Sequence, residues 1–279
     1  MIQDKYSAVW VSHSSLGDFS KCPRSYYLKN VYKNPKTGKK INIVSPALSL
    51  GSAVHQVVEG LGAFKVEERF TQNLEEEFEK AWAKYSGKKG GFLTEADEKE
   101  AKERGLAMIR RVAANPGPLK NKTVKLPERE MLPNFYLSEA DNIILCGKID
   151  WIEYIPEDDS IRVLDFKTGK NEEKEDSLQL PIYLLLLKNL QKRKVSGAAY
   201  WYLDKDDAPV AVKLPDVDKA FADVLEKAKK VKEAREEKGF FCPKGEKGCF
   251  ACRPFEKILK GEAECLGVGE YNQELYLVN

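Results

Sequence analysis

Two stretches rich in β-branched and apolar residues, Ile143–Ile155 and Ile161–Phe166, constrain the fold of this chain most. A polar segment, Pro156–Ser160, separates them. Strand-forming residues on both sides of a short polar segment are typical of a β-hairpin. We therefore expect two adjacent antiparallel strands near the middle of the chain, and any fold assigned to the sequence has to be built around them.

Two acids and a lysine fall on this predicted hairpin. Because side chains alternate along a strand, Asp165 and Lys167 would point to one face while Leu164 and Phe166 point to the other. We expect Asp150, in the sequence Gly-Lys-Ile-Asp, to lie on the neighbouring strand. Two carboxylates and an ammonium group at one edge of a sheet suit a divalent cation, a water molecule and a phosphodiester.

Charge and hydropathy exclude several classes of protein. The 46 Lys and Arg residues are nearly balanced by 44 Asp and Glu residues, and the net charge of +2 is not that of a protein held on nucleic acid by bulk charge. Every apolar run is far shorter than the roughly 20 residues that a membrane span needs. The first residues lack the apolar core of a signal peptide, so we expect a cytoplasmic protein, of a cell or of an infected host. Its six cysteines are then not expected to form structural disulfides.

Helical periodicity and turn residues place the hairpin in an α/β chain. Besides a helix over Thr71–Tyr85, the expected helices cover Ser52–Phe64, Glu95–Ala114 (ending before Asn-Pro-Gly), Ser177–Leu190 and Val217–Glu237. Further strands are expected after the helix over Ser177–Leu190. The order of elements predicts a mixed sheet flanked by helices, preceded by a helical part.

Four further motifs accompany the hairpin. A cysteine followed by proline stands at Cys22, and the segment Leu50–His55 begins a predicted helix with one of the two histidines of the chain. Gln179 and Tyr183 are spaced four residues apart, so they share a helix face. Near the C-terminus, the Cys-x-x-Cys segment at 249–252 has the spacing of metal ligands.

With the two hairpin segments, these motifs resemble, in order along nearly the whole chain, those of the PD-(D/E)XK nuclease superfamily. The resemblance is to its RecB-like branch, which includes AddB nuclease domains and the CRISPR-associated exonucleases that carry an iron–sulfur cluster. It implies a restriction-endonuclease-like mixed sheet core flanked by helices. It also implies a single domain over 1–279, with an N-terminal arm and helical part in 1–120 and a catalytic core in 121–215. A long helix and a cysteine-rich tail in 216–279 would close on the N-terminus.

The resemblance also implies roles for the residues around the hairpin. Asp150, Asp165 and the backbone carbonyl of Phe166 would bind Mg²⁺ or Mn²⁺, since hard cations prefer oxygen ligands. His55 would add a nitrogen ligand, which favours Mn²⁺ over Mg²⁺ somewhat. Lys167 would orient the attacking water or help to deprotonate it, and would offset charge in the transition state.

Several other residues near the site have candidate roles. Gln179 and Tyr183 would hold the substrate strand or the lysine in place, although packing of Tyr183 into the core explains its position equally well. Glu59 follows the histidine by four residues and is either a support for it or a solvated helix position. A further hypothesis is that Glu128 or Glu130 assists a second metal ion.

The cysteines resemble an iron–sulfur ligand set. In the resembled proteins, one N-terminal cysteine joins three near the C-terminus around a [4Fe–4S] cluster. Cys22, Cys249 and Cys252 match three of these positions. No cysteine stands at the fourth, for which Cys265 keeps the order of the motif and Cys242 is the alternative. Four thiolates suit Zn²⁺ equally well, and unligated thiols are a third possibility; order and position favour iron–sulfur.

The resemblance implies a hydrolase: a DNA-binding, metal-dependent deoxyribonuclease, more typical of an exonuclease than of an endonuclease. Single-stranded DNA or duplex ends would be the substrate, in DNA repair, recombination or CRISPR adaptation. The chain has no phosphate-binding GxxxxGK[ST] loop, so a helicase, an integrase or a phage recombination protein is a candidate partner. The alternative is an inactive nuclease-fold scaffold, which the presence of Asp150, Asp165 and Lys167 disfavours.

Overall fold

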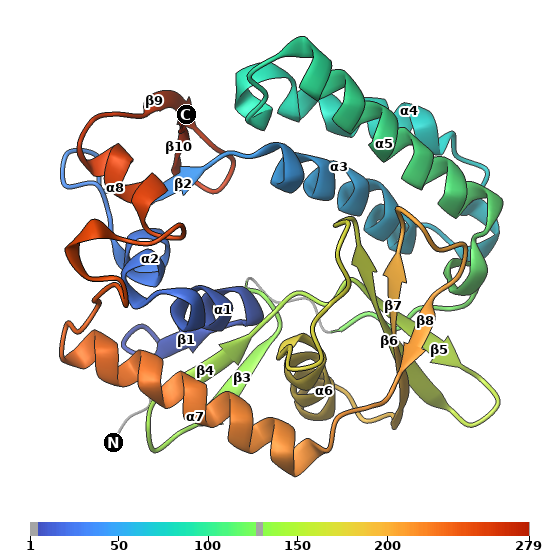
Figure 1. Cartoon of the computed structure of the whole chain (residues 1–279). Coiled ribbons are helices and arrows are strands. Elements are labelled where there is room, and N and C mark those ends of the chain that lie inside the picture. Colours follow the sequence, from blue (N-terminus) through green and yellow to red (C-terminus); the bar gives the residue numbers. More distant parts are fainter. Residues whose placement is uncertain (1–4, 127–130, 279) are drawn as a thin grey trace. The chain divides into compact units, whose positions relative to one another are not determined.

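The computed structural model describes residues 5–126 and 131–278 as a mixed α/β fold (Figure 1). The chain forms two compact units, each built from separate stretches of sequence. Unit 1 consists of Met1–Ser45, Tyr136–Cys146 and Phe221–Asn279, and unit 2 of Pro46–Phe135 and Gly147–Ala220. The predicted α/β fold class is thus confirmed. No helix among the described residues is long and apolar enough to cross a membrane.

Unit 2 is centred on a four-stranded sheet of order β5-β6-β7-β8. Its strands are β5 (Trp151–Ile155), β6 (Ser160–Lys167), β7 (Val195–Tyr202) and β8 (Val210–Val212). β5 and β6 form the predicted antiparallel hairpin, and β6 pairs with β7 in parallel. The central strand β6 has six buried residues among its eight, as expected for a strand covered on both faces.

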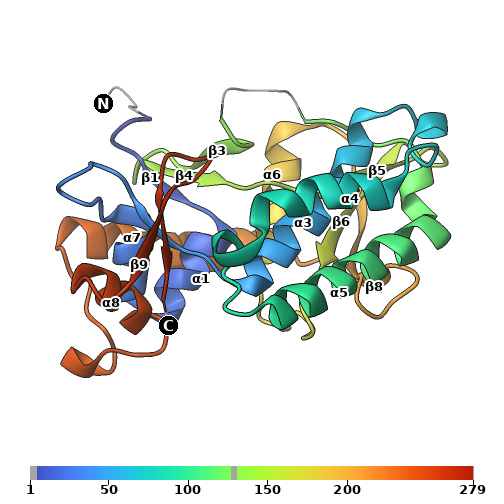
Figure 2. The same cartoon turned by 90° about the horizontal axis from the view of Figure 1, so that it is seen from above.

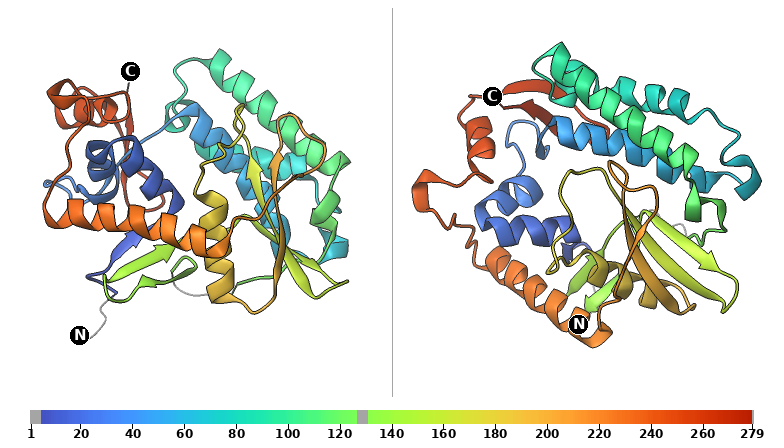
Figure 3. Two further views of the ribbon diagram at one scale, coloured as in Figure 1. Left: turned by 60° about the horizontal axis from the view of Figure 1, so that its bottom comes forward. Right: turned by 45° about the vertical axis from the view of Figure 1, so that its right-hand side comes forward.

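Helices cover the two faces of this sheet. On one face, α3 (Pro46–Gly60), α4 (Leu74–Trp82) and α5 (Glu95–Ala114) share a buried core with Leu164, Phe166 and Trp201 of the sheet. On the other face, α6 (Gln179–Leu190) packs on Ile152, Ile161, Val163 and Tyr200. Figure 2 and the right view in Figure 3 show these two layers. Short 3₁₀ turns complete unit 2: Leu61–Ala63, Val66–Glu68, Ala83–Tyr85, Gly87–Gly90 and Gly117–Lys120.

Unit 1 contains two three-stranded sheets. One has the order β1-β4-β3, with β1 (Val9–Val11) parallel to β4 (Ile143–Cys146); β3 (Asn134–Ser138) begins in unit 2. The other has the order β2-β10-β9 and consists of β2 (Ile41–Ile43), β9 (Glu264–Val268) and β10 (Glu274–Leu277). Because β2 pairs with β10, a strand near the start of the sequence is completed by one near its end.

The helices of unit 1 are short except for α7 (Val217–Glu236), which belongs to this unit from Phe221 onward. The others are α1 (His13–Lys21), α2 (Pro23–Tyr26), a π-helical turn (Tyr27–Val31), a 3₁₀ turn (Gly245–Lys247) and α8 (Arg253–Leu259). The left view in Figure 3 shows α7 in orange and α1 in blue.

The structure corrects one expectation about the hairpin. The stretch Ile143–Ile155 is not one strand: β4 pairs with β1, whereas β5 pairs with β6 in a different sheet. The break falls at Gly147, whose amide donates to the carbonyl of Pro133 at 3.1 Å instead of to a strand. A Cβ at Gly147 would lie 3.1 Å from Leu186 Cδ1, so glycine allows close packing here. Asp150 therefore precedes β5 rather than lying on a strand.

Candidate functional site

In unit 2, His55 and Glu59 of α3 lie beside Asp150, which precedes β5. One potential ligand atom from each of the three residues lies within 4.8 Å of the others. The spacing of four residues places His55 and Glu59 on one helix face. Gly51 allows α3 to approach the end of β6, because a Cβ there would lie 3.2 Å from Thr168 Oγ1.

Asp165 is held by two residues of α6. Its carboxylate is almost completely buried, and its Oδ1 accepts hydrogen bonds from Gln179 Nε2 at 2.6 Å and from the Tyr183 hydroxyl at 3.1 Å. Gln179 Nε2 also donates to that hydroxyl at 3.2 Å. Tyr183 is buried as well, so it packs in the core, and its hydroxyl contacts the acid rather than the lysine.

Lys167 forms a second part of this network. Its ammonium group lies 2.8 Å from Asp165 Oδ2 and 2.9 Å from Glu173 Oε2, and it donates to Gln179 Oε1. Burial lowers the pKa of Lys167, but the charges of Asp165 and Glu173 outweigh burial and leave the pKa raised. Lys167 is therefore a cationic hydrogen-bond donor at neutral pH. Gln179 joins the two residues, because its amide oxygen accepts from Lys167 and its amide nitrogen donates to Asp165.

Asp150 is linked to β6 through the backbone. Its Oδ2 accepts a hydrogen bond from the amide of Phe166 at 2.9 Å and lies 3.6 Å from His55 Nδ1. Burial and the negative charge of Asp165 raise the pKa of Asp150 to about 7. A divalent cation between these carboxylates would offset both the desolvation and the mutual repulsion.

Glu59 supports the histidine rather than facing solvent. Its Oε1 lies 2.8 Å from His55 Nδ1, and its Oε2 lies 2.5 Å from the ammonium group of Lys148. Burial raises the pKa of Glu59, but the hydrogen bonds with His55 and Lys148 outweigh burial and lower it. Burial lowers the pKa of His55, but Glu59 and the charge of Asp150 outweigh burial and raise it.

The donor set of this site fits the expected cation. The grouped residues His55, Glu59 and Asp150 offer two carboxylates and an imidazole, ligands that Mg²⁺ or, with the nitrogen, Mn²⁺ accepts. Asp165 is not in this group and lies on the neighbouring strand β6. Sequence reasoning left Glu59 open and missed Glu173, which contacts the lysine from a polar loop with no recognisable motif. Glu128 and Glu130 lie outside the described residues.

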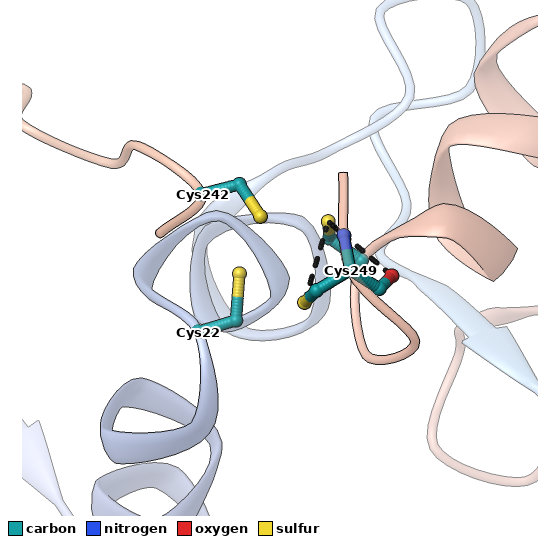
Figure 4. A group of neighbouring side chains, drawn as sticks. Cys22, Cys242 and Cys249 are labelled. Carbon is teal, nitrogen blue, oxygen red and sulfur yellow. Dashed lines mark hydrogen bonds between the residues drawn. The ribbon is translucent and has the colours of Figure 1, made fainter. Parts of the chain in front are cut away.

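In unit 1, four cysteines converge from three segments of the chain. Cys22 directly precedes α2, Cys242 and Cys249 lie in the loops after α7, and Cys252 directly precedes α8. Their sulfur atoms all lie within 4.8 Å of one another, and Figure 4 shows the labelled ones pointing toward a common centre. Cys265 is not in this group: it is exposed on β9, where it neighbours Tyr276 of β10. The geometry therefore favours Cys242, the alternative, as the fourth ligand.

The surroundings of the sulfurs suit thiolates. Backbone amides of Ser25, Lys244 and Cys249 donate to the sulfurs of Cys22, Cys242 and Cys252 at 3.4, 3.4 and 3.2 Å. Such N–H···S bonds orient metal-binding thiolates and stabilise their charge. Burial raises the pKa of Cys22 to about 12. A cation would be needed to hold such a buried thiol as thiolate at neutral pH.

The spacing of the sulfurs bears on the metal. Cys249 Sγ and Cys252 Sγ are 3.8 Å apart, too far for a disulfide. A zinc ion with four sulfurs at about 2.3 Å places them about 3.8 Å apart. A [4Fe–4S] cubane has iron and sulfide at alternate corners and is larger than a single ion, so it would require the cysteine sulfurs to move outward. The donor set fits either group.

Comparison with known protein families identifies the superfamily. The model of the family described as the PD-(D/E)XK nuclease superfamily matches residues 10–255. The chain belongs to the PD-(D/E)XK nuclease superfamily. No curated protein matches the chain. The matched range contains the hairpin, the α3 and α6 residues and Cys22, Cys242, Cys249 and Cys252, whereas Cys265 lies beyond it. Membership in this nuclease superfamily implies phosphodiester chemistry with a divalent metal ion.

Proposed function

We propose that the protein is a metal-dependent deoxyribonuclease of the RecB-like branch, acting as an exonuclease on single-stranded DNA or duplex ends. The observation that carries this proposal is the network in which Gln179 joins Lys167 to Asp165, beside His55 and Asp150. A carboxylate that is buried only for packing would not need contacts with a lysine, an amide and a tyrosine. Such contacts, beside the group of potential metal ligands His55, Glu59 and Asp150, are typical of a functional site.

In this proposal, His55, Asp150, Asp165 and the backbone carbonyl of Phe166 hold Mg²⁺ or Mn²⁺. When bound, the ion lowers the pKa of a water molecule and polarises the phosphate. Lys167 stays protonated, so it donates to the attacking water or to a phosphate oxygen and offsets developing negative charge.

Three other residues position these groups. Gln179 and Tyr183 fix the Asp165 carboxylate through the hydrogen bonds to its Oδ1. Glu59 accepts from His55 Nδ1, which leaves Nε2 as the nitrogen with a free lone pair. We assign none of the three a direct part in bond cleavage.

We further propose that Cys22, Cys242, Cys249 and Cys252 bind a structural metal centre. The resemblance to the cluster-containing nucleases makes this a [4Fe–4S] cluster, with Zn²⁺ as the alternative. Its role is to join the N-terminal and C-terminal segments of unit 1. A cytoplasmic location and a helicase, integrase or phage recombination partner follow from the same resemblance.

The proposed activity is tested with end-labelled single-stranded and duplex DNA, using anaerobically purified protein with Mn²⁺, Mg²⁺ or EDTA. We expect degradation with Mn²⁺ or Mg²⁺ and none with EDTA. A circular single strand serves as the control, because an exonuclease leaves it intact. Absence of cleavage under all metal conditions, with DNA binding retained, would favour an inactive scaffold instead.

Metal affinity should depend on pH because the ligands must lose their protons first. With the pKa of Asp150 near 7 and that of His55 raised, protons compete with the metal below neutral pH. We expect the dissociation constant of Mn²⁺, measured by calorimetry, to be at least about tenfold larger at pH 6 than at pH 8. Equal affinities at the two pH values would contradict this ligand assignment.

A further inference from the structure

A basic cavity lies beside the cysteine site in unit 1, and the function proposed above does not use it. Its volume is about 1110 Å³, and Cys242 and Cys252 form part of its wall. We call it the cysteine-side groove. Among its lining residues, Lys and Arg outnumber Glu seven to three, so the groove is positive although the whole chain is nearly neutral.

Aromatic rings are interleaved with these cations. Tyr27 and Phe240 line the groove with their ring centroids 5.0 Å apart, and the Arg24 guanidinium lies 5.6 Å from the centroid of Tyr27. Phe241 also lines the groove, but its side chain is 78% exposed. A large apolar ring that is exposed to water in a basic groove offers a stacking surface to a ligand with a flat face.

We propose that the cysteine-side groove binds a single-stranded segment of nucleic acid. A base stacks on Phe241, while Lys238, Arg253 and Lys260 contact phosphates. All three cations are exposed, and a positive groove with aromatic side chains is the general design of single-strand binding sites. The choice of DNA as the strand rests on the proposed nuclease function; the groove itself would bind the strand without cleaving it.

The combination of groups favours a single strand over other anions. A free phosphate would contact the cations but leave Phe241 in water. Within a duplex the base faces are covered by their neighbours, so only an unpaired base can stack on an isolated ring. The wall of the groove is formed by residues of α2, the loops after α7 and α8.

A second explanation for the cations is that they offset the thiolates. Four thiolates around a divalent ion leave an excess of negative charge, and Arg24 and Arg253 lie near the cysteines. Arg24, however, already pairs with Glu256 at 2.6 Å. The thiolate explanation also gives no role to Phe241. The two explanations differ in what the variants change: metal content in one case and DNA affinity in the other.

The first experiment measures binding of a fluorescent oligo(dT) strand by anisotropy, with the full chain and no added divalent cation. We expect Phe241→Ala to bind about tenfold more weakly, within the range for loss of one stacked base. Phe241→Trp should keep the affinity, because it keeps the stacking surface. The matched control is Tyr271→Ala, which removes another exposed ring, 87% exposed in unit 1 but outside the groove.

The second experiment measures the salt dependence of the same binding. Each phosphate contact to a single strand contributes about 0.7 to the slope of log K against log salt. The double variant Lys238→Ala/Lys260→Ala should therefore lower the slope by about 1.4. Lys65→Ala/Lys89→Ala removes the same charge from exposed positions in unit 2 and should leave the slope unchanged.

Metal content and cleavage are measured on every variant. The inference is overturned if Phe241→Ala binds like the unchanged protein, if it loses affinity only together with its metal, or if duplex binding falls as much as single-strand binding. The proposed nuclease function has its own test, because it fails if the unchanged protein does not cleave DNA with Mn²⁺. If the unchanged protein cleaves DNA and Phe241→Ala binds the strand normally, only the proposal about the groove is overturned.

Discussion

Replacing Lys167 with alanine should reduce the cleavage rate at least about a hundredfold, the usual effect of losing one preorganised charge-stabilising donor. Lys167 is the cation that contacts Asp165, Glu173 and Gln179 together. The loss should appear in single-turnover cleavage of labelled DNA with Mn²⁺. DNA binding should remain, because one buried ammonium contributes little to a phosphate-backbone interaction.

Two further variants make this result interpretable. Asp165→Asn keeps the shape and the oxygen that accepts from Gln179 and Tyr183, so it should lose activity without unfolding. Lys188→Ala removes an exposed lysine from α6 in the same unit and should cleave normally. If Lys167→Ala folds with an unchanged melting temperature and retains more than about a tenth of the activity, the active-site assignment is wrong.

Replacing Cys242 with serine should remove the metal centre and destabilise unit 1. A centre that joins Cys22 to three cysteines of the C-terminal part closes a loop of more than two hundred residues, and structural metal sites contribute folding free energy directly. We expect iron and acid-labile sulfide, or zinc, to fall to background. We also expect a melting temperature roughly 10 °C lower, which corresponds to a loss of a few kcal/mol.

Cys265→Ser is the matched control for this prediction. Its thiol is exposed on β9, so its removal should change neither metal content nor melting temperature. The opposite pattern, with metal lost from Cys265→Ser and kept in Cys242→Ser, would restore the ligand order that the sequence motif suggests. The same elemental analysis on the unchanged protein distinguishes iron–sulfur from zinc.

Elements with strong local signals were predictable from sequence. The bounds expected for α5, Glu95–Ala114, coincide with the observed helix, because Thr94 caps its start and Asn-Pro-Gly ends it. The β5–β6 hairpin was also predictable, since apolar residues flank a polar turn. The assignment of Ile143–Ile155 to a single strand was wrong because strand propensity reports the local backbone and not the sheet that a segment joins.

The residues of the candidate site likewise divide into those that sequence motifs single out and those that they do not. Motif spacing singled out Asp150, Asp165, Lys167 and Gln179, and the structure brings these side chains together around the end of β6. Glu173 had no signal, because it reaches the lysine from a polar loop whose course depends on tertiary contacts. The choice between Cys242 and Cys265 could not be made from spacing, since both lie on segments whose paths the sequence does not fix.

The interleaving of the two units along the chain sets an order for folding during synthesis. Unit 2 needs no residue beyond Ala220, whereas the first 45 residues belong to a unit that lacks β10 until the ribosome reaches Glu274–Leu277. At roughly 5–20 residues per second, this final stretch takes several seconds. During that interval the nascent chain exposes the edge of β2 that later pairs with β10, and Cys22 lacks the three cysteines that complete its metal site. A chaperone that shields this N-terminal segment, or a delay in delivery of the metal, would therefore affect yield before it affected catalysis.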